Sequence, residues 1–149
     1  MKALILGIGN PILTDDGVGI KIAQKLRENN PELEVVETSE VGMALLELIV
    51  GYDKLIIIDS IKTVQGKPGG LYKLKLEDLK SHMYFSSSHG IDIPTVIELG
   101  QKAGYKMPGY ISLYAVEAKD NSTFGEECTK EVEERIPFII KQIIEEEGL

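Results

Sequence analysis

The chain has 149 residues, of which 43% are hydrophobic, and this size and composition fit one globular domain over residues 1–149. Its 24 acidic and 16 basic residues give a net charge of −8, which disfavours a nucleic-acid partner because phosphate backbones bind to basic faces. No apolar run is long enough for a membrane span, and the first residues lead into a strand rather than a signal peptide, so we expect a cytoplasmic protein.

Strands and helices alternate along the first part of the chain. The apolar run 3–6 predicts a strand, and apolar residues at helical spacing predict a helix over 17–28. A second strand is predicted over 33–37, a second helix over 42–50 and a third strand over 55–59. The third strand is apolar on both faces, which is typical of a central strand covered by helices on each side.

The rest of the chain predicts two more strands and two more helices. Apolar residues and lysines alternate over 71–76, which indicates an edge strand, and we expect it to run antiparallel to the others. A helix is predicted over 91–103 and a fifth strand over 110–115. The apolar stripe over 130–144 predicts a final helix that Pro137 kinks or divides into two.

This order of elements predicts a three-layer α/β sandwich, with a mainly parallel, twisted sheet of about five strands and helices on both faces. In such sheets ligands bind beyond the carboxyl ends of the strands. Three polar features fall at that edge: the pair Asp15 and Asp16 after the first strand, Asp59 at the end of the third, and His89 just before a helix. We expect them to converge although they are far apart in sequence.

The connection from the first strand to the first helix is rich in glycine. Such loops usually cradle phosphate at the helix N-terminus, but this one ends in two carboxylates, which argues for a cation. A dinucleotide-binding fingerprint is incomplete, because Ile12 stands at the position of the third glycine after Gly7 and Gly9.

Two carboxylates and an imidazole would suit a divalent transition metal and leave coordination positions open for a substrate. Each residue also has a structural alternative. Asp15 or Asp16 can cap the helix, and Asp59 can start a turn with Ser60. A loop histidine such as His89 can have no role beyond a hydrogen bond to the backbone. These alternatives remain open on the residues alone.

Cys128 is the only cysteine, so neither an internal disulfide nor a cysteine-cluster metal site can form. It lies in a polar stretch with no histidine nearby in sequence, and a reactive thiol needs a neighbour that lowers its pKa. The sequence therefore favours a bystander thiol over a nucleophile.

Three motifs resemble those of the hydrogenase maturation endopeptidases. They are Gly7-Ile8-Gly9-Asn10 with Asp15-Asp16-Gly17, then Leu55-Ile56-Ile57-Ile58-Asp59-Ser60, and then Ser88-His89-Gly90 followed by a helix. The resemblance continues in order through residues 114–117 and 124–137. It implies a phosphorylase/hydrolase-like fold, in which a twisted sheet is sandwiched by helices.

Members of that family remove a C-terminal extension from the large subunit of a nickel-iron hydrogenase after nickel has been inserted. The resemblance implies that the partner is such a large-subunit precursor and that Asp16, Asp59 and His89 contact the metal. Nickel would then come with the substrate rather than stay bound to the enzyme. Glu37 stands in for an aspartate linked to substrate recognition, since 37–42 departs from the family's Asp-Gly-Gly.

The catalytic residues stay open at this stage. No serine or cysteine triad is evident, and a metal-bound water with Asp15 as its general base is one candidate arrangement.

Two other functions compete with the protease. A magnesium-binding receiver-like signalling module would use the acidic pair and Asp59, but receivers place the pair directly after the first strand, whereas eight residues separate Leu6 from Asp15. A peptidyl-tRNA hydrolase-like esterase has a similar opening, yet its Thr-Arg-His-Asn signature is absent, and acid stands where the catalytic histidine belongs.

Overall fold

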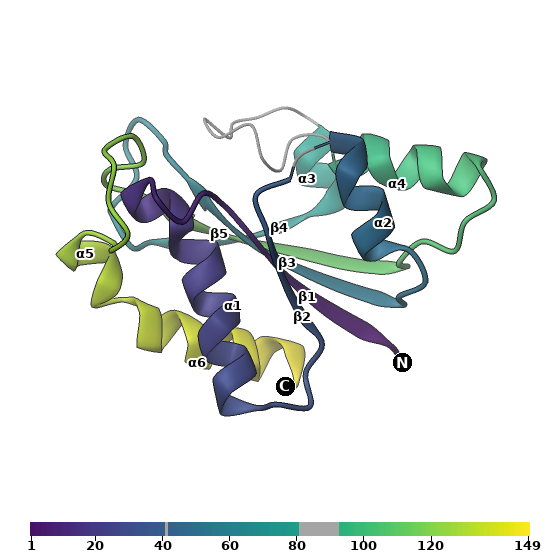
Figure 1. Ribbon diagram of the computed structural model, residues 1–149, viewed down its shortest axis with the longest axis horizontal. Helices are drawn as coiled ribbons and strands as arrows, with labels where there is room; N and C mark the ends of the chain where they lie inside the picture. Colours follow the sequence, from purple (N-terminus) through teal and green to yellow (C-terminus); the bar gives the residue numbers. More distant parts are fainter. Residues whose placement is uncertain (41, 81–92) are drawn as a thin grey trace.

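The computed structural model describes residues 1–40, 42–80 and 93–149, which form one five-stranded sheet flanked by helices (Figure 1). The strands are β1 (Ala3–Ile8), β2 (Val35–Thr38), β3 (Lys54–Ile61), β4 (Leu71–Lys75) and β5 (Tyr110–Glu117). Their order across the sheet is β2-β1-β3-β5-β4, and only β4 pairs antiparallel. The predicted parallel sheet, its central third strand and its antiparallel edge are thus confirmed.

Helices pack on both faces of the sheet. In chain order they are η1 (Thr14–Gly17), α1 (Val18–Asn29), η2 (Gly42–Leu45), α2 (Leu46–Ile49), α3 (Leu76–Lys80), α4 (Ile93–Lys102), α5 (Lys130–Glu133) and α6 (Ile136–Glu147). Helices α1 and α6 cover one face and α2 and α4 the other (Figure 1), which confirms the three-layer α/β prediction. Within the described residues, no helix is both long and apolar enough to cross a membrane.

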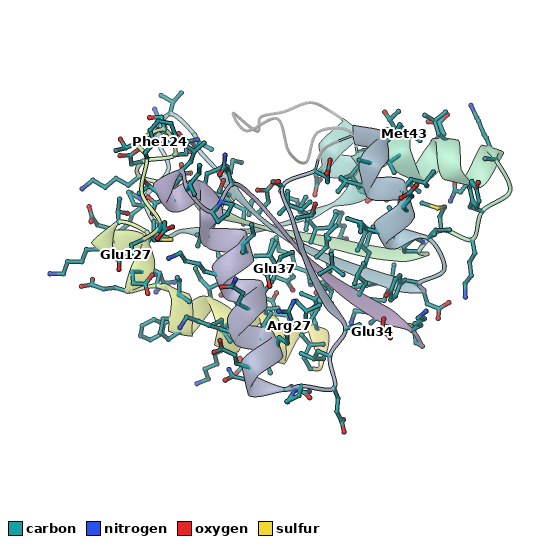
Figure 2. The ribbon with its side chains drawn as sticks, viewed as in Figure 1. Arg27, Glu34, Glu37, Met43, Phe124 and Glu127 are labelled. Carbon is teal, nitrogen blue, oxygen red and sulfur yellow. The ribbon has the colours of Figure 1, made fainter. Side chains whose placement is uncertain are left out.

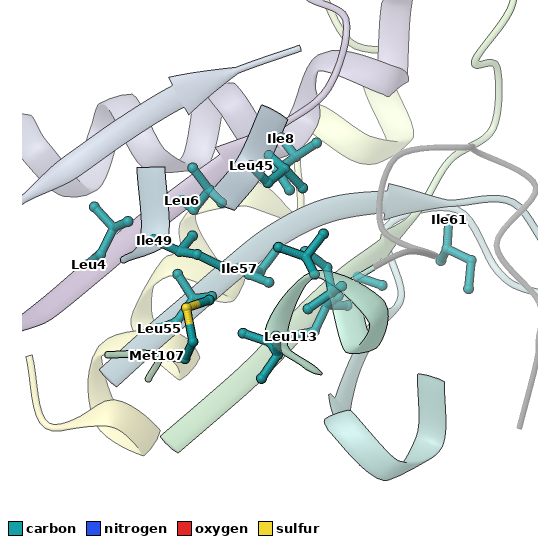
Figure 3. Close-up of a cluster of buried hydrophobic side chains, with 14 residues drawn as sticks. Leu4, Leu6, Ile8, Leu45, Ile49, Leu55, Ile57, Ile61, Met107 and Leu113 are labelled. Atoms are coloured by element: carbon teal, nitrogen blue, oxygen red, sulfur yellow. The ribbon is translucent and has the colours of Figure 1, made fainter. Parts of the chain in front are cut away.

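The central strands supply two hydrophobic cores, because successive side chains of a strand point to opposite faces. The core under α2 and α4 contains the residues labelled in Figure 3, among them Leu6 and Ile57. The opposite core contains Ile5 and Ile56, packed against α1, α5 and α6. Apolar residues on both faces of β1 and β3 therefore hold the three layers together.

Two glycines, Gly9 in the opening loop and Gly19 in the first turn of α1, allow close packing. A Cβ atom on Gly19 would lie 2.2 Å from the carbonyl oxygen of Ile58, so a glycine here lets α1 approach β3. A Cβ on Gly9 would lie 2.1 Å from the carbonyl oxygen of Asp16. The absence of a side chain at Gly9 thus allows the loop to fold back over the turn that carries Asp16.

Several boundaries differ from the predicted ones. Strand β3 continues to Ile61 and stays paired with β5, so Asp59 lies inside the strand opposite Ala115 rather than at its end. Strand β2 begins two residues later than expected, after a turn in which Leu33 N donates to the Asn30 carbonyl oxygen. The final helix is divided, and Pro137 lies in the first turn of α6, where a missing N–H is tolerated.

Candidate functional site

The carboxylates of Asp16 and Asp59 are both buried at the carboxyl side of the sheet. Asp16 lies in η1 and is 4% exposed, and Asp59 lies in β3 and is 0% exposed. Buried carboxylates need hydrogen-bond donors to offset the loss of water. Asp16 accepts one bond from the Asn10 backbone N–H to Oδ2, at 3.0 Å.

Ser60 connects the two carboxylates. Its hydroxyl donates to Oδ1 of Asp16 at 2.9 Å, and its backbone N–H donates to Oδ1 of Asp59 at 2.7 Å. The structure therefore brings together two of the three residues that the sequence predicted to converge. The role of Ser60 was missed, and its only sequence signal is a hydroxyl residue directly after the strand aspartate.

Asp15 faces the loop that follows β5. Its Oδ2 accepts bonds from the backbone N–H groups of Lys119 and Asp120, each at 3.0 Å, and from the Thr129 hydroxyl at 2.8 Å. Its Oδ1 accepts the Thr129 N–H at 2.7 Å, and the residue is 0% exposed. Four donors on one buried carboxylate indicate a structural anchor, and this geometry disfavours Asp15 as a general base.

Helix capping does not explain the acidic pair. The N-cap of α1 is Gly17, and no side chain makes a capping hydrogen bond there. Adjacent aspartates thus serve different parts of the molecule, with Asp15 fixing a distant loop and Asp16 bonding toward β3.

Replacing Asp15 by asparagine tests the anchor role. An amide cannot accept all four bonds, because its NH₂ group faces donors, so we expect a loss of about 2 kcal/mol in the free energy of unfolding. The measurement is urea denaturation, together with the pH dependence of substrate cleavage. A variant that has wild-type stability but has lost the fall in rate at low pH, which protonation of a general base causes, would restore the general-base role of Asp15.

The third predicted ligand, His89, lies outside the described residues. Within the part of the chain that the structure describes, no three His, Cys, Asp or Glu side chains gather closely enough to hold a metal ion. The contribution of His89 therefore stays a prediction.

Glu37 lies on β2, and its side chain reaches α1. Its Oε1 accepts a bond from Gln24 at 2.8 Å, and its Oε2 pairs with Arg27 at 2.9 Å. Arg27 also donates to the Val35 carbonyl oxygen, so it covers part of the outer edge of β2. A groove of about 370 Å³ runs beside this end of β2, and it is lined by Glu37, Thr38, Glu40, Met43, Ala44, Glu47 and Leu48.

Cys128 is half-buried, with its sulfur 4.0 Å from the Thr14 carbonyl oxygen. Burial, together with the nearby Asp15 carboxylate, raises the pKa of the thiol to about 12. The thiol therefore stays protonated near neutral pH, as expected for a bystander rather than a nucleophile.

Comparison with known proteins identifies the family. Residues 20–146 match the family model described as hydrogenase maturation protease. The chain belongs to the hydrogenase maturation protease family. Membership makes it a hydrolase that acts in protein processing and removes the receiver and peptidyl-tRNA hydrolase alternatives.

Individual relatives of this maturation protease carry matching names. It is 34% identical over 82 residues to the hydrogenase 2 maturation protease of Escherichia coli, an alignment that covers 53% of this chain and 50% of the relative. The match thus spans half the length of that relative. It is 24% identical over 150 residues to the hydrogenase expression/formation protein HupD of Rhodobacter capsulatus, covering 97% of this chain and 70% of HupD.

Solved structures give the same fold. The hydrogenase maturating endopeptidase HybD from E. coli superposes with a TM-score of 0.82 and 27% identity, covering 99% of this chain and 94% of HybD. The nickel-iron hydrogenase maturation protease HybD from Thermococcus kodakarensis superposes with a TM-score of 0.73 and 24% identity, covering 97% and 98% of the two chains. At 24% identity, this second likeness shows a shared fold.

Proposed function

We propose that this maturation protease removes a C-terminal extension from the large-subunit precursor of a nickel-iron hydrogenase, and that it recognises the nickel already bound in that precursor. The observation that supports nickel recognition is the pair of buried carboxylates, Asp16 and Asp59, which both accept hydrogen bonds from Ser60.

The chemistry of the pair suits this substrate. Carboxylate oxygens with an imidazole nitrogen, supplied in our proposal by His89, form a ligand set for a divalent transition metal with open positions. Those positions are filled by the precursor's own ligands, so the nickel stays part of the substrate. Cleavage then works as a checkpoint, whose stringency is the difference in affinity between metal-loaded and metal-free precursor.

The same geometry limits which groups can attack the scissile carbonyl. The protonated Cys128 thiol and the fully engaged Asp15 carboxylate are both poor candidates. We therefore propose that water attacks the scissile carbonyl, and a metal bound beside it would supply Lewis-acid activation. The roles of Asp16 and Asp59 are to hold that metal and fix its position.

We retain Glu37 as a substrate-recognition residue on the groove beside β2. Glu40 and Glu47 line the same groove, so its charge complements a basic segment of the precursor. The cytoplasmic location expected from the sequence, and the single domain over residues 1–149, stay predictions of this proposal.

The test compares nickel-loaded and nickel-free precursor as substrates of the purified protease. We expect the loaded form to be cleaved at least about 100-fold faster, which corresponds to about 2.7 kcal/mol of differential binding. Cleavage is followed by the mass of the large subunit. His89→Ala is expected to lower cleavage of the loaded form, and equal rates on both forms of the precursor would sink the checkpoint proposal.

A further inference from the structure

Two loops at the carboxyl side of the sheet are joined by backbone hydrogen bonds. The N–H of Gly125 donates to the Ile12 carbonyl oxygen and the N–H of Thr14 to the Gly125 carbonyl oxygen, both at 2.9 Å. Leu13 and Gly125 thereby form a parallel bridge. We call residues 10–14 and 120–125 together the two-loop ridge.

Side-chain hydrogen bonds fix the conformation of the two-loop ridge. The Thr14 hydroxyl donates to the Thr123 carbonyl oxygen, and Thr14 itself has a φ of 52°, which a β-branched residue adopts only under constraint. Asp120 accepts the N–H groups of Ser122 and Thr123, each at 3.0 Å, and a hydrogen bond from the Thr123 side chain together with these two bonds lowers its pKa to about 2. Asp15 anchors the base of the second loop.

Two large apolar side chains are exposed on this ridge. Phe124 is 80% exposed and Ile12 is 48% exposed, and the bridge between Leu13 and Gly125 places them next to each other in register. Figure 2 shows Phe124 at the outer end of its loop. Single exposed apolar residues are ordinary, whereas large side chains that anchor a protein interface are clustered.

We propose that the two-loop ridge is the docking surface for the large-subunit precursor, with Ile12 and Phe124 as its apolar anchors. This inference rests on the proposed function. Thr14 and Asp16 lie in the same short helix, η1, and the N–H of Asn10, the first ridge residue, donates to Asp16, so a protein that presents a metal to Asp16 is brought next to the ridge. Because the loops are already ordered, docking loses little conformational entropy.

The charge around the ridge specifies the partner's chemistry. Glu126 and Glu127 follow the ridge directly, and both are exposed. The complementary surface on the precursor is therefore an apolar hollow with lysine or arginine residues at its rim.

The experiment measures cleavage of the nickel-loaded precursor by Phe124→Ser and Ile12→Ser variants. Each is expected to raise KM about tenfold with kcat within about twofold, because an anchor that contacts only the body of the precursor affects binding and not the chemical step. Phe124→Tyr keeps the aromatic ring and is expected to restore the wild-type KM. Thermal unfolding should be unchanged in all three variants, since both side chains are exposed.

Phe138→Ser is the matched control, because Phe138 is also an exposed phenylalanine, 62% exposed, but lies on α6. Its KM should equal that of the wild type. An unchanged KM for Phe124→Ser, measured with active wild-type enzyme, would overturn the docking surface. An inactive wild-type enzyme on every precursor tested would instead count against the proposed function.

Discussion

Replacing Asp16 or Asp59 by asparagine is expected to reduce processing of nickel-loaded precursor by at least about 100-fold. The amide keeps the shape of the side chain but removes the negative charge, and a neutral amide is a much weaker ligand for a divalent metal. Changes to the outer-shell partners of metal ligands already lower affinity or activity by about 10- to 100-fold. The measurement is kcat/KM for cleavage, with circular dichroism to confirm that the fold persists.

Two further variants separate this effect from a general loss of charge. Asp53→Asn changes a carboxylate directly before β3, where it accepts the Lys2 N–H at 2.8 Å and pairs with Lys106 at 2.8 Å. Because Asp53 lies at the other end of that strand from Asp59, we expect normal processing. Ser60→Ala removes the hydroxyl that positions Asp16, and we expect an intermediate loss of about tenfold. If Asp16→Asn and Asp59→Asn both kept wild-type activity, neither aspartate would take part in the mechanism.

Glu147→Gln is expected to give the largest loss of stability, about 3 kcal/mol or roughly 6–12 °C in Tm. The Glu147 side chain is completely buried between α6 and the sheet. Its Oε1 pairs with Lys54 at 3.1 Å, and its Oε2 accepts the hydroxyl protons of Ser112 at 2.9 Å and Tyr114 at 2.5 Å. The neutral amide would leave Lys54 half-buried without its counter-charge and would present a donor to two hydroxyl groups.

The contribution of Glu147 should also depend on pH. Burial alone would raise its pKa, but the hydrogen bonds from Tyr114, Lys54 and Ser112 outweigh burial and lower the pKa from 4.5 to about 2. A lowered native pKa stabilises the fold fully above the ordinary value of 4.5, and this stabilisation is lost as the pH falls toward 2. The difference in unfolding free energy between wild type and Glu147→Gln should therefore shrink over this range.

Glu146→Gln is the matched control for that measurement. Glu146 is the neighbouring residue, but its side chain is 34% exposed, and it contacts the Tyr114 hydroxyl at 3.0 Å, the Gln142 amide at 3.0 Å and Lys73 at 3.8 Å. Partly exposed pairs contribute at most about 1 kcal/mol. Equal effects of the two substitutions in urea denaturation between pH 7 and pH 2 would contradict the buried network.

The fold was predictable because its signals are local. Alternation of period 2 marked β4 as an edge strand, and the doubly apolar run of β3 marked it as central, before any tertiary contact was known. Boundaries were less predictable. The pairing of β3 with β5 carries both strands two residues past their predicted ends, and this extension depends on a partner that no local window contains.

For the candidate site, the sequence could predict that Asp16 and Asp59 lie near one edge of the sheet, but not which groups they contact. The sequence placed Asp16 after one parallel strand and Asp59 near the carboxyl end of another, so both could be expected at one edge, yet the two aspartates at 15 and 16 look alike in the sequence. What distinguishes them is the contact of Asp15 with Thr129, 114 residues away, and the contact of Asp16 with Ser60, 44 residues away. Long-range hydrogen bonds of this kind leave no periodic pattern.

The hydrogen bonds of Ser60 to Asp16 and Asp59 bear on which partner changes its conformation when the precursor binds. Both carboxylates are hydrogen-bonded to Ser60, and Asp16 also to the Asn10 N–H, so their positions are set when the protease folds and not when a metal arrives. A rigid pair cannot adjust to an ion held at the wrong depth or angle. If these carboxylates hold the precursor's metal, as we propose, the immature subunit supplies the movement, and a precursor whose own metal centre is already shaped is the one that brings its ion within reach.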